Sequence, residues 1–320
     1  KYFKSSEDLI RILDSINNIP LIEIKKNLSE IAKRRYQWQT ITKKYIITID
    51  IGGTKTNIGY FLDKKLVKTI NFSTLKFGPD NINKISEILL DSQKNILAIC
   101  LSLTGLINSR GLWNPINKKT LGNFVNYPIV KKLNSFFNVP VYALGDTQAA
   151  ALGELYYGGG RNLSNFFYLT ISTGIGGSIV QNKSLFQGKI SDVGSLGHTV
   201  IKFNGKLCGC GRRGCLEAYA SGNALIKSNK IKKCKNTKDL LTKFKNKKQT
   251  INIVNQAIEK IVQSMINVNN LIRIDNFIIG GSVGLNSFFY KKIKDQLEKK
   301  QLPIKIKKAK LQSKAELYGC

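Results

Sequence analysis

Four potential metal ligands lie close together in the sequence and set the strongest constraint on how this chain can fold. The only histidine, His198, is followed by Cys208, Cys210 and Cys215 in a His-x9-Cys-x-Cys-x4-Cys pattern. One imidazole and three thiolates complete a tetrahedral set for Zn²⁺, and glycines between them let the backbone turn tightly. The alternative is a group of ordinary buried thiols. The spacing predicts a structural zinc knot over residues 198–215, with no position left for a catalytic water.

Length and composition indicate a globular protein with room for two domains. The chain has 320 residues, 42% of them hydrophobic, and no apolar run approaches the roughly 18 residues of a membrane span. It begins without a methionine and without a signal peptide, so we expect a piece of a longer product. Cysteine ligands must stay reduced, which predicts a cytoplasmic location.

The net charge of +31 could indicate a protein that binds nucleic acid or an anionic membrane surface. The lysines are spread along the chain, however, and the densest run, Lys227 to Lys248, lacks the aromatic interleaving on which bases stack. We therefore interpret the charge as a solvated surface and expect no nucleic-acid partner. The positive field should still attract polyanions such as nucleotide phosphates.

The predicted secondary structure changes character at Tyr45. Apolar spacing in residues 1–44 predicts two helices, the second over 21–34 after Pro20. Beyond Tyr45, strands are expected at 45–51, 57–62, 65–73, 96–103, 139–146, 165–172, 178–181 and 276–282, and helices at 81–93, 147–158, 251–272 and 287–297. Each half opens on a strand, a glycine turn and a second strand, which predicts a duplicated α/β unit with a central cleft.

Three glycine-rich turns follow buried strands and suit phosphate binding. After Asp50, the turn Gly52–Thr54 offers backbone N–H groups and a hydroxyl to an anion, while Asp50 can hold a hydrated Mg²⁺. The segments 172–178 and 278–284 are similar turns. A single turn could be purely structural, but three in register predict a nucleoside triphosphate site. The nucleotide-binding candidates are Asp50, Gly52, Gly53, Thr54, Lys55, Thr173, Gly174, Gly176, Gly280 and Gly281.

Five motifs of the chain belong together: DIGGTKTNIGYF, GDTQAAALGE, STGIGGS, the histidine–cysteine run with CLEAYASG, and IIGGSVG. Together they resemble the ROK family of sugar kinases and repressors. The resemblance implies an actin-like (RNase H-like) two-domain α/β fold in which ATP and sugar meet in the cleft. We expect one lobe at 45–157, with 305–320 packing back on it, and a second lobe at 158–304. The resemblance also implies a homodimer.

The resemblance places the catalytic base of the family's kinases at Asp146. A sugar hydroxyl is a poor nucleophile, so a carboxylate must accept its proton, while Mg²⁺ and backbone amides position and neutralise the phosphates. The alternative role for Asp146 is the N-cap of a helix that begins at Thr147. The resemblance further implies four sugar-binding residues: Gly105, Asn126, Glu217 and His198, the last through the ring nitrogen that is not on zinc.

Two departures from the family pattern affect sugar recognition. Family kinases usually have Asn immediately before the catalytic Asp and two residues after it, where this chain has Gly145 and Gln148. They also usually have Glu three residues before the zinc histidine, where this chain has Ser195. Because unpaired hydroxyls are costly, these losses predict weakened or redirected sugar recognition.

The expected function is ATP-dependent phosphorylation of a hexose or N-acylhexosamine, of the glucokinase or N-acetylmannosamine kinase type. One alternative is a ROK-type repressor, although residues 1–44 are too short for a full winged helix-turn-helix. Another is a catalytically weak sugar-binding module fused to a glycosyltransferase. The segments YFKSSEDLIRIL and NLSEIAKRRYQWQTITKKY resemble the closing helices of retaining GT-B glycosyltransferases, with a simple helical extension as the alternative.

Overall fold

The computed structural model describes residues 44–116 and 121–320. The two helices expected within residues 1–44 and the glycosyltransferase-like segments therefore lie outside the described residues, apart from Lys44 and Tyr45. Within the described ranges, no helix is both long enough and apolar enough to cross a membrane.

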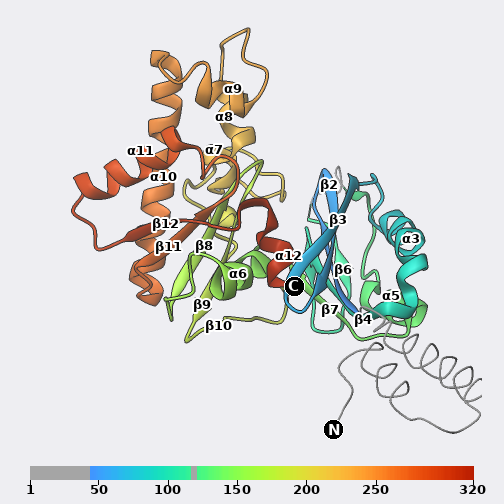
Figure 1. The fold of residues 1–320 in the computed structure, drawn as a ribbon. Coiled ribbons are helices and arrows are strands. Elements are labelled where there is room, and N and C mark those ends of the chain that lie inside the picture. Colours follow the sequence, from blue (N-terminus) through green and yellow to red (C-terminus); the bar gives the residue numbers. More distant parts are fainter. Residues whose placement is uncertain (1–43, 117–120) are drawn as a thin grey trace, which may run out of the picture. The chain divides into compact units, whose positions relative to one another are not determined.

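The first half contains a five-stranded mixed sheet with the order β3-β2-β1-β4-β7 (Figure 1). Strands β1, β2 and β3 pair antiparallel, and β4 pairs parallel with β7. The strands are β1 (Tyr45–Ile51), β2 (Lys55–Leu62), β3 (Lys65–Ser73), β4 (Ile96–Leu103) and β7 (Val141–Gly145). Two helices accompany them, α3 (Gly78–Leu89) and α5 (Ile129–Phe137), and both bury an apolar stripe.

The second half repeats this arrangement with the order β10-β9-β8-β11-β12. Strands β8, β9 and β10 pair antiparallel, and β11 pairs parallel with both β8 and β12. The strands are β8 (Phe166–Ile171), β9 (Ile175–Gln181), β10 (Ser184–Leu185), β11 (Asn276–Gly280) and β12 (Lys305–Lys308). The duplicated α/β unit expected from the sequence thus corresponds to two sheets of the same strand order.

Five helices belong to the second half, and two of them bury the largest apolar faces. The long helix α10 and the helix α11 pack together with β8 and β11 around a core that includes Ile261, Met265 and Phe289. The five are α7 (Glu217–Ala220), α8 (Gly222–Ser228), α9 (Thr237–Thr242), α10 (Lys248–Ile272) and α11 (Ser287–Lys299).

Smaller elements complete the described part of the chain. A short hairpin follows β4, and helix α6 follows β7 and packs on both β9 and the last helix, α12. The elements are β5 (Leu106–Ile107), β6 (Trp113–Asn114), α6 (Asp146–Tyr157), α12 (Ala315–Gly319) and the 3₁₀ helices η1 (Leu90–Asn95), η2 (Leu196–His198) and η3 (Gln312–Lys314).

Several predicted elements have different limits in the structure, and two of these differences involve residues discussed above. The strand expected at 178–181 begins earlier, at Ile175, so Gly176 lies inside β9 and not in the turn. The helix expected at 81–93 begins at Gly78, because Pro79 suits the first turn of a helix, and its α-helical part ends at Leu89 before η1.

The boundary between the two lobes stays a prediction. Residues 305–308 form β12, which pairs with β11 in the second sheet. Helix α12, by contrast, packs on α6 and touches β2 of the first sheet.

Candidate active site

Asp146 is the first residue of α6, at the point where β7 ends. The residue before it, Gly145, is the N-cap, and its N–H donates to Gln148 Oε1 at 3.1 Å. The helix therefore begins one residue earlier than expected, and Gln148 supplies the capping contact. This leaves the Asp146 carboxylate for another role, at a helix N-terminus where a negative charge is favoured.

Two donors orient the Asp146 carboxylate. The Thr147 N–H donates to Oδ1 at 2.7 Å, and the Thr104 hydroxyl donates to Oδ2 at 3.1 Å. Burial nevertheless raises the pKa of Asp146 above its usual value, against the lowering effect of these hydrogen bonds. The result is a half-buried, oriented carboxyl group of raised basicity, which is what a general base needs.

Asp50 is the second-last residue of β1 and precedes the first glycine turn. Its carboxylate accepts from Asn57 Nδ2 at 3.1 Å and from Ser102 Oγ at 2.9 Å. Burial raises the pKa of Asp50 to about 6, and the charge of Asp146 adds to the increase. Glu316 of α12 joins this group, because burial followed by the charge of Asp50 raises its pKa to about 8.

The hairpin β5–β6 contacts two of the expected sugar-binding residues, Gly105 just before β5 and Asn126 beyond β6. Gly105 has φ +123°, and a Cβ there would lie 2.9 Å from Trp113 Nε1. The Asn126 N–H donates to Asn114 Oδ1 at 2.8 Å, and the two side chains are bonded to each other at 3.2 Å. Since Trp113 Nε1 also donates to the Thr104 carbonyl oxygen, this hairpin holds the residue that orients Asp146.

The first glycine turn, between β1 and β2, is anchored by Thr74. The Gly52 N–H donates to the Lys55 carbonyl oxygen at 3.1 Å, and the Thr74 hydroxyl donates to the Gly52 carbonyl oxygen at 2.8 Å. Gly53 is half-buried, and Thr54 and Lys55 are exposed. The turn is therefore held at Gly52 by Thr74, while Thr54 and Lys55 are exposed to solvent.

The second and third glycine turns lie side by side. Ser172 Oγ is 3.2 Å from Ser282 Oγ, and the N–H groups of Val283 and Gly284 both donate to the Ile171 carbonyl oxygen. Gly281 has φ +80°, and a Cβ there would collide with that same carbonyl. Two of the three predicted phosphate turns are thus brought together by direct hydrogen bonds.

The other nucleotide-binding candidates in the second and third glycine turns differ in their exposure to solvent. Thr173 is exposed, whereas Gly280 is buried beneath Tyr168. Gly174 lies against Glu217, and Gly176 lies against Thr147 of α6. Gly176 therefore allows β9 to approach the helix that carries Asp146.

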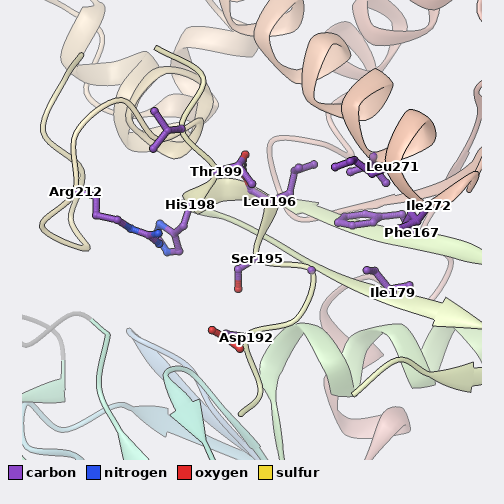
Figure 2. Close-up of a pocket in the computed structure, with 13 residues that line it drawn as sticks. Phe167, Ile179, Asp192, Ser195, Leu196, His198, Thr199, Arg212, Leu271 and Ile272 are labelled. Atoms are coloured by element: carbon purple, nitrogen blue, oxygen red, sulfur yellow. Dashed lines mark hydrogen bonds between the residues drawn. The ribbon is translucent and has the colours of Figure 1, made fainter. Parts of the chain in front are cut away.

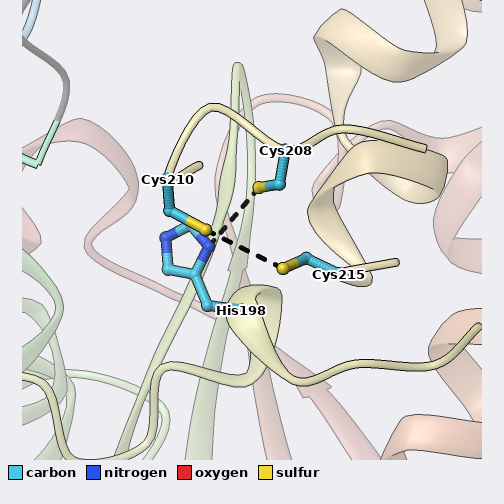
Figure 3. A group of neighbouring side chains, drawn as sticks. All are labelled: His198, Cys208, Cys210 and Cys215. Carbon is cyan, nitrogen blue, oxygen red and sulfur yellow. Dashed lines mark hydrogen bonds between the residues drawn. The ribbon is translucent and has the colours of Figure 1, made fainter. Parts of the chain in front are cut away.

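The four expected metal ligands converge on one point (Figure 3). Their donor atoms lie within 4.8 Å of one another. Cys210 Sγ is 3.8 Å from Cys215 Sγ, and Cys208 Sγ is 3.7 Å from His198 Nδ1. Tetrahedral zinc with Zn–S near 2.3 Å and Zn–N near 2.0 Å would place its ligand atoms roughly 3.6–3.8 Å apart. The two distances of 3.7 and 3.8 Å match this tetrahedral spacing, and all four donor atoms lie within 4.8 Å of one another.

The thiols of this cluster differ in acidity. Burial raises the pKa of Cys208 to about 12. At Cys210 burial acts in the same direction, but hydrogen bonds from Arg212 outweigh it and lower the pKa of the thiol. Because a thiol releases its proton when it binds a metal, metal affinity at this cluster should increase with pH.

Glu217 and His198, the other expected sugar-binding residues, flank the metal cluster. Glu217 Oε2 accepts from the Ile175 N–H at 2.9 Å, and Oε1 lies 3.8 Å from Cys208 Sγ. Since His198 directs Nδ1 towards Cys208, its Nε2 is the nitrogen left for another contact. Glu217 thus connects the cluster to the start of β9.

A cavity of about 540 Å³ lies beside the cluster, on the second half (Figure 2). One end is apolar, with Phe167, Ile179 and Leu271, and the other carries His198 and Arg212. Its mainly apolar lining does not suit a polyhydroxylated substrate.

The sequence missed three residues with evident roles. Thr104 orients Asp146, and Ser191 contacts the β5–β6 hairpin through Ile107. Glu154 accepts from three backbone N–H groups, so that it ties α6 to the segment before α12. Only Glu154, inside the motif GDTQAAALGE, carried any signal in the sequence.

Comparison with known proteins places the described fold among sugar kinases. The model of the ROK family matches residues 46–320. The N-acetylmannosamine kinase of Vibrio vulnificus is 34% identical over 268 residues, covering 82% of this chain and 91% of that protein.

Two solved structures give the same result at the level of the fold. The ROK hexokinase of Thermus thermophilus superposes with a TM-score of 0.74 at 26% identity, covering 86% of this chain and 96% of that one. A ROK glucokinase of Streptomyces griseus, solved with glucose and AMPPNP, has a TM-score of 0.74 at 21% identity and covers 86% and 97%. The fold is therefore the actin-like α/β two-domain fold.

Proposed function

The chain belongs to the ROK family and is an ATP-dependent sugar kinase, and we propose that its acceptor is an N-acylhexosamine deprotonated by Asp146. The observation that carries the choice of acceptor is the 34% identity to an N-acetylmannosamine kinase over 91% of that protein's length. A simple hexose is the second candidate, favoured by the likeness to a ROK hexokinase at 26% identity.

The chain's own residues supply the proton acceptor. Thr104 and Thr147 hold the two oxygens of the Asp146 carboxylate, and the raised pKa of this group increases its basicity. A sugar hydroxyl within hydrogen-bond reach of Asp146 loses its proton to the carboxylate as the oxygen attacks the γ-phosphorus of ATP. In the glycine turns the N–H groups of Gly52 and Ser172 are used by Lys55 and Gly174, so Gly53, Thr54, Thr173 and Gly174 would offer their N–H groups to the phosphates.

Asp50 fits a divalent cation. Each of its oxygens accepts one hydrogen bond and retains lone pairs, and burial together with the nearby Asp146 charge opposes its ionisation. A cation beside it would offset this unfavourable burial of negative charge. When bound there, Mg²⁺ would neutralise charge on the ATP phosphates.

We further propose that the cluster His198, Cys208, Cys210 and Cys215 holds a structural Zn²⁺. The donor spacing near 3.7–3.8 Å supports this assignment. With four protein ligands, the ion would brace the segment between η2 and α7 and would leave His198 Nε2 to face a substrate.

Phosphorylation is tested by measuring ADP release from ATP and Mg²⁺ with N-acetylmannosamine, N-acetylglucosamine, glucose and mannose. We expect the N-acylhexosamines to be preferred. Asp146→Asn should lower kcat by about 10²–10⁴-fold. The exposed Asp91→Asn is the matched control and should leave kcat unchanged. A folded wild-type protein that releases no ADP with any of these sugars would contradict the assignment.

The expected homodimer has support from one exposed apolar surface. Leu271, at the end of α10, lines the apolar cavity and is 82% exposed, and Val200, which lines the same cavity, is 51% exposed. We propose that a second copy covers this surface. Leu271→Glu should then convert the dimer into a monomer in light scattering, whereas Leu90→Glu, at another exposed leucine, should not.

The glycosyltransferase fusion stays a prediction, since it rests on residues 1–44. Expression of the full gene product, followed by an assay for sugar transfer from nucleotide sugars, would test it.

A further inference from the structure

Helix α6, whose first residue is Asp146, packs against strand β9 of the second sheet (Figure 1). Residues two apart in a strand point to the same face, and Gly176 and Ser178 of β9 both meet Thr147. The Ser178 hydroxyl donates to Thr147 Oγ1 at 3.0 Å. A Cβ at Gly176 would lie 2.6 Å from the Thr147 methyl carbon, Cγ2. The strand therefore contacts both branches of the Thr147 side chain.

These contacts fix the Thr147 side chain in one rotamer. A β-branched side chain is already stiff at χ1. Rotation of Thr147 about χ1 would break the hydrogen bond and leave the Ser178 hydroxyl without its acceptor. Ser178 is fully buried, and in the part of the chain that the structure describes its side chain is hydrogen-bonded to Thr147 alone. Because a buried unpaired hydroxyl is costly, the observed rotamer is strongly favoured.

Thr147 in turn orients the candidate base. Its N–H donates to Asp146 Oδ1 at 2.7 Å, and the Thr104 hydroxyl donates to Oδ2 at 3.1 Å. Thr104 directly follows β4 of the first sheet, whereas Ser178 lies in β9 of the second sheet. One oxygen of the carboxylate is thus held from the first sheet by Thr104, and the other is held through Thr147, which the second sheet fixes.

We propose that Ser178 is a positioning residue for the candidate base and acts on Asp146 through the hydroxyl of Thr147. Ser178 is fully buried and therefore does not touch ATP or the sugar. Its hydrogen bond keeps the first turn of α6, and with it the Asp146 carboxylate, in one orientation. A carboxylate that must accept a proton as the sugar oxygen attacks is less effective when its orientation varies. The proposal rests on the kinase function and on Asp146 as base.

Ser178→Ala tests the positioning role by kinetics with ATP and the best acceptor among N-acetylmannosamine, N-acetylglucosamine, glucose and mannose. We expect kcat to fall about tenfold, while KM for ATP and for the sugar stays within about twofold. Ser264→Ala is the matched control, because it also removes a buried hydroxyl, which donates to the Lys260 carbonyl oxygen within α10 at 2.9 Å. It should leave kcat unchanged. A kcat of Ser178→Ala equal to that of the control would overturn the proposal.

Variants of Thr147 test whether the effect passes through its hydroxyl. Thr147→Val keeps the branched shape and the backbone N–H but removes the acceptor, so kcat should fall about as far as in Ser178→Ala. Thr147→Ser keeps the hydroxyl, and its kcat should lie about threefold or more above that of Thr147→Val. In S178A/T147V the loss of kcat should be no greater than in Thr147→Val, because both changes remove the same hydrogen bond. Losses that multiply in the double variant would contradict the proposal.

Hydrogen exchange of the Thr147 amide, measured by NMR, separates this proposal from the kinase function. Since this N–H donates to Asp146 Oδ1, it should exchange about tenfold faster in Ser178→Ala and at the wild-type rate in Ser264→Ala. Faster exchange in a protein that phosphorylates none of the four sugars would contradict the kinase function and support the link from Ser178 to Asp146. Normal turnover and unchanged exchange in Ser178→Ala would overturn the positioning role and leave the kinase function intact.

Discussion

At the scale of single residues, the described structure concentrates carboxyl groups whose protonation is perturbed. Asp50, Asp146 and Glu316 come from β1, α6 and α12, and burial raises the pKa of each. Such perturbed groups gather where a protein performs proton transfer or binds cations. These three carboxyl groups indicate that the chemically active part of the first half lies at the ends of β1 and β7.

This perturbation predicts the pH dependence of activity. Asp146 accepts a proton only when ionised, and its raised pKa, like the value of about 6 at Asp50, moves ionisation to higher pH than for an ordinary aspartate. We expect kcat/KM to fall as pH decreases through about 6. Because the two groups interact, the apparent pKa belongs to the pair. A pH–rate profile that stays flat to about pH 4.5 would contradict this.

Glu154 lies outside the candidate active site, and its replacement should destabilise the fold. Its carboxylate accepts from the N–H groups of Gly159, Lys310 and Leu311 at 2.6, 3.0 and 2.8 Å. Glu154→Gln replaces one acceptor by an NH₂ group that faces a donor, which should lower the free energy of unfolding by about 2–4 kcal/mol. Urea denaturation measures this, and the exposed Glu87→Gln should be neutral. Equal stability of the two variants would show that these hydrogen bonds contribute little.

At the scale of elements, the contact between α6 and α12 determines where Asp146 lies. Ala149 and Gly153 on α6 meet Ala315 and Gly319 on α12, so the two backbones approach without side chains between them. Tyr318 adds ring contacts to Phe61 of β2 and Tyr157 of α6, at centroid distances of 5.1 and 5.3 Å. Helix α12 thus fixes α6 against the first sheet.

Adding a methyl group at this contact should destabilise the protein. In Gly319→Ala, the new Cβ would collide with the carbonyl oxygen of Ala149, and a backbone atom cannot move away as a flexible side chain can. We expect a loss of about 1–3 kcal/mol and a lower Tm by calorimetry. Gly209→Ala is the control, since a Cβ at Gly209 meets no atom within 4 Å. A Tm of Gly319→Ala equal to that of the control would mean that α12 can shift at no cost.

At the scale of the whole described molecule, two sheets have the same strand order. The segments outside these sheets contain the candidate base and the metal cluster. Helix α6 leads from β7 of the first sheet to β8 of the second, and its first residue is Asp146. The metal cluster lies in the long segment between β10 and α7. This segment has little apolar core of its own. Isolated bridges such as Val200–Cys215 are its only strand pairing among the described residues.

Loss of the metal should therefore loosen the second half. In Cys210→Ser the protein should lose about one zinc per chain, and Tm should fall, because structural zinc contributes directly to folding. Metal analysis and calorimetry measure these effects. Cys234→Ser removes a thiol outside the cluster and should keep the metal. Wild-type protein that is fully folded and contains no zinc would refute the assignment.

Local patterns in the sequence accounted for most strands, for the glycine turns and for the four clustered ligands. The strands at 45–51, 65–73 and 96–103 have the observed limits, because buried strands are continuous apolar runs that turn residues interrupt. The convergence of His198 with the cysteines was also predictable, since all four lie within a short loop. The short elements β5, β6 and α12 were missed, because each consists of few residues and is stabilised by distant partners.

The sequence alone determined the family, the duplicated order of elements and the identity of the candidate base, because these depend on motifs that are local in the chain. Only the tertiary structure decided what surrounds that base. Thr104 and Ser191 lie 42 residues before and 45 residues after Asp146, and their contacts with β7 and α6 exist because the fold brings those segments together. In the sequence, Gly145 only marked a position where the family has a side chain. In the structure, Ser191 lies close to the place that such a side chain would occupy.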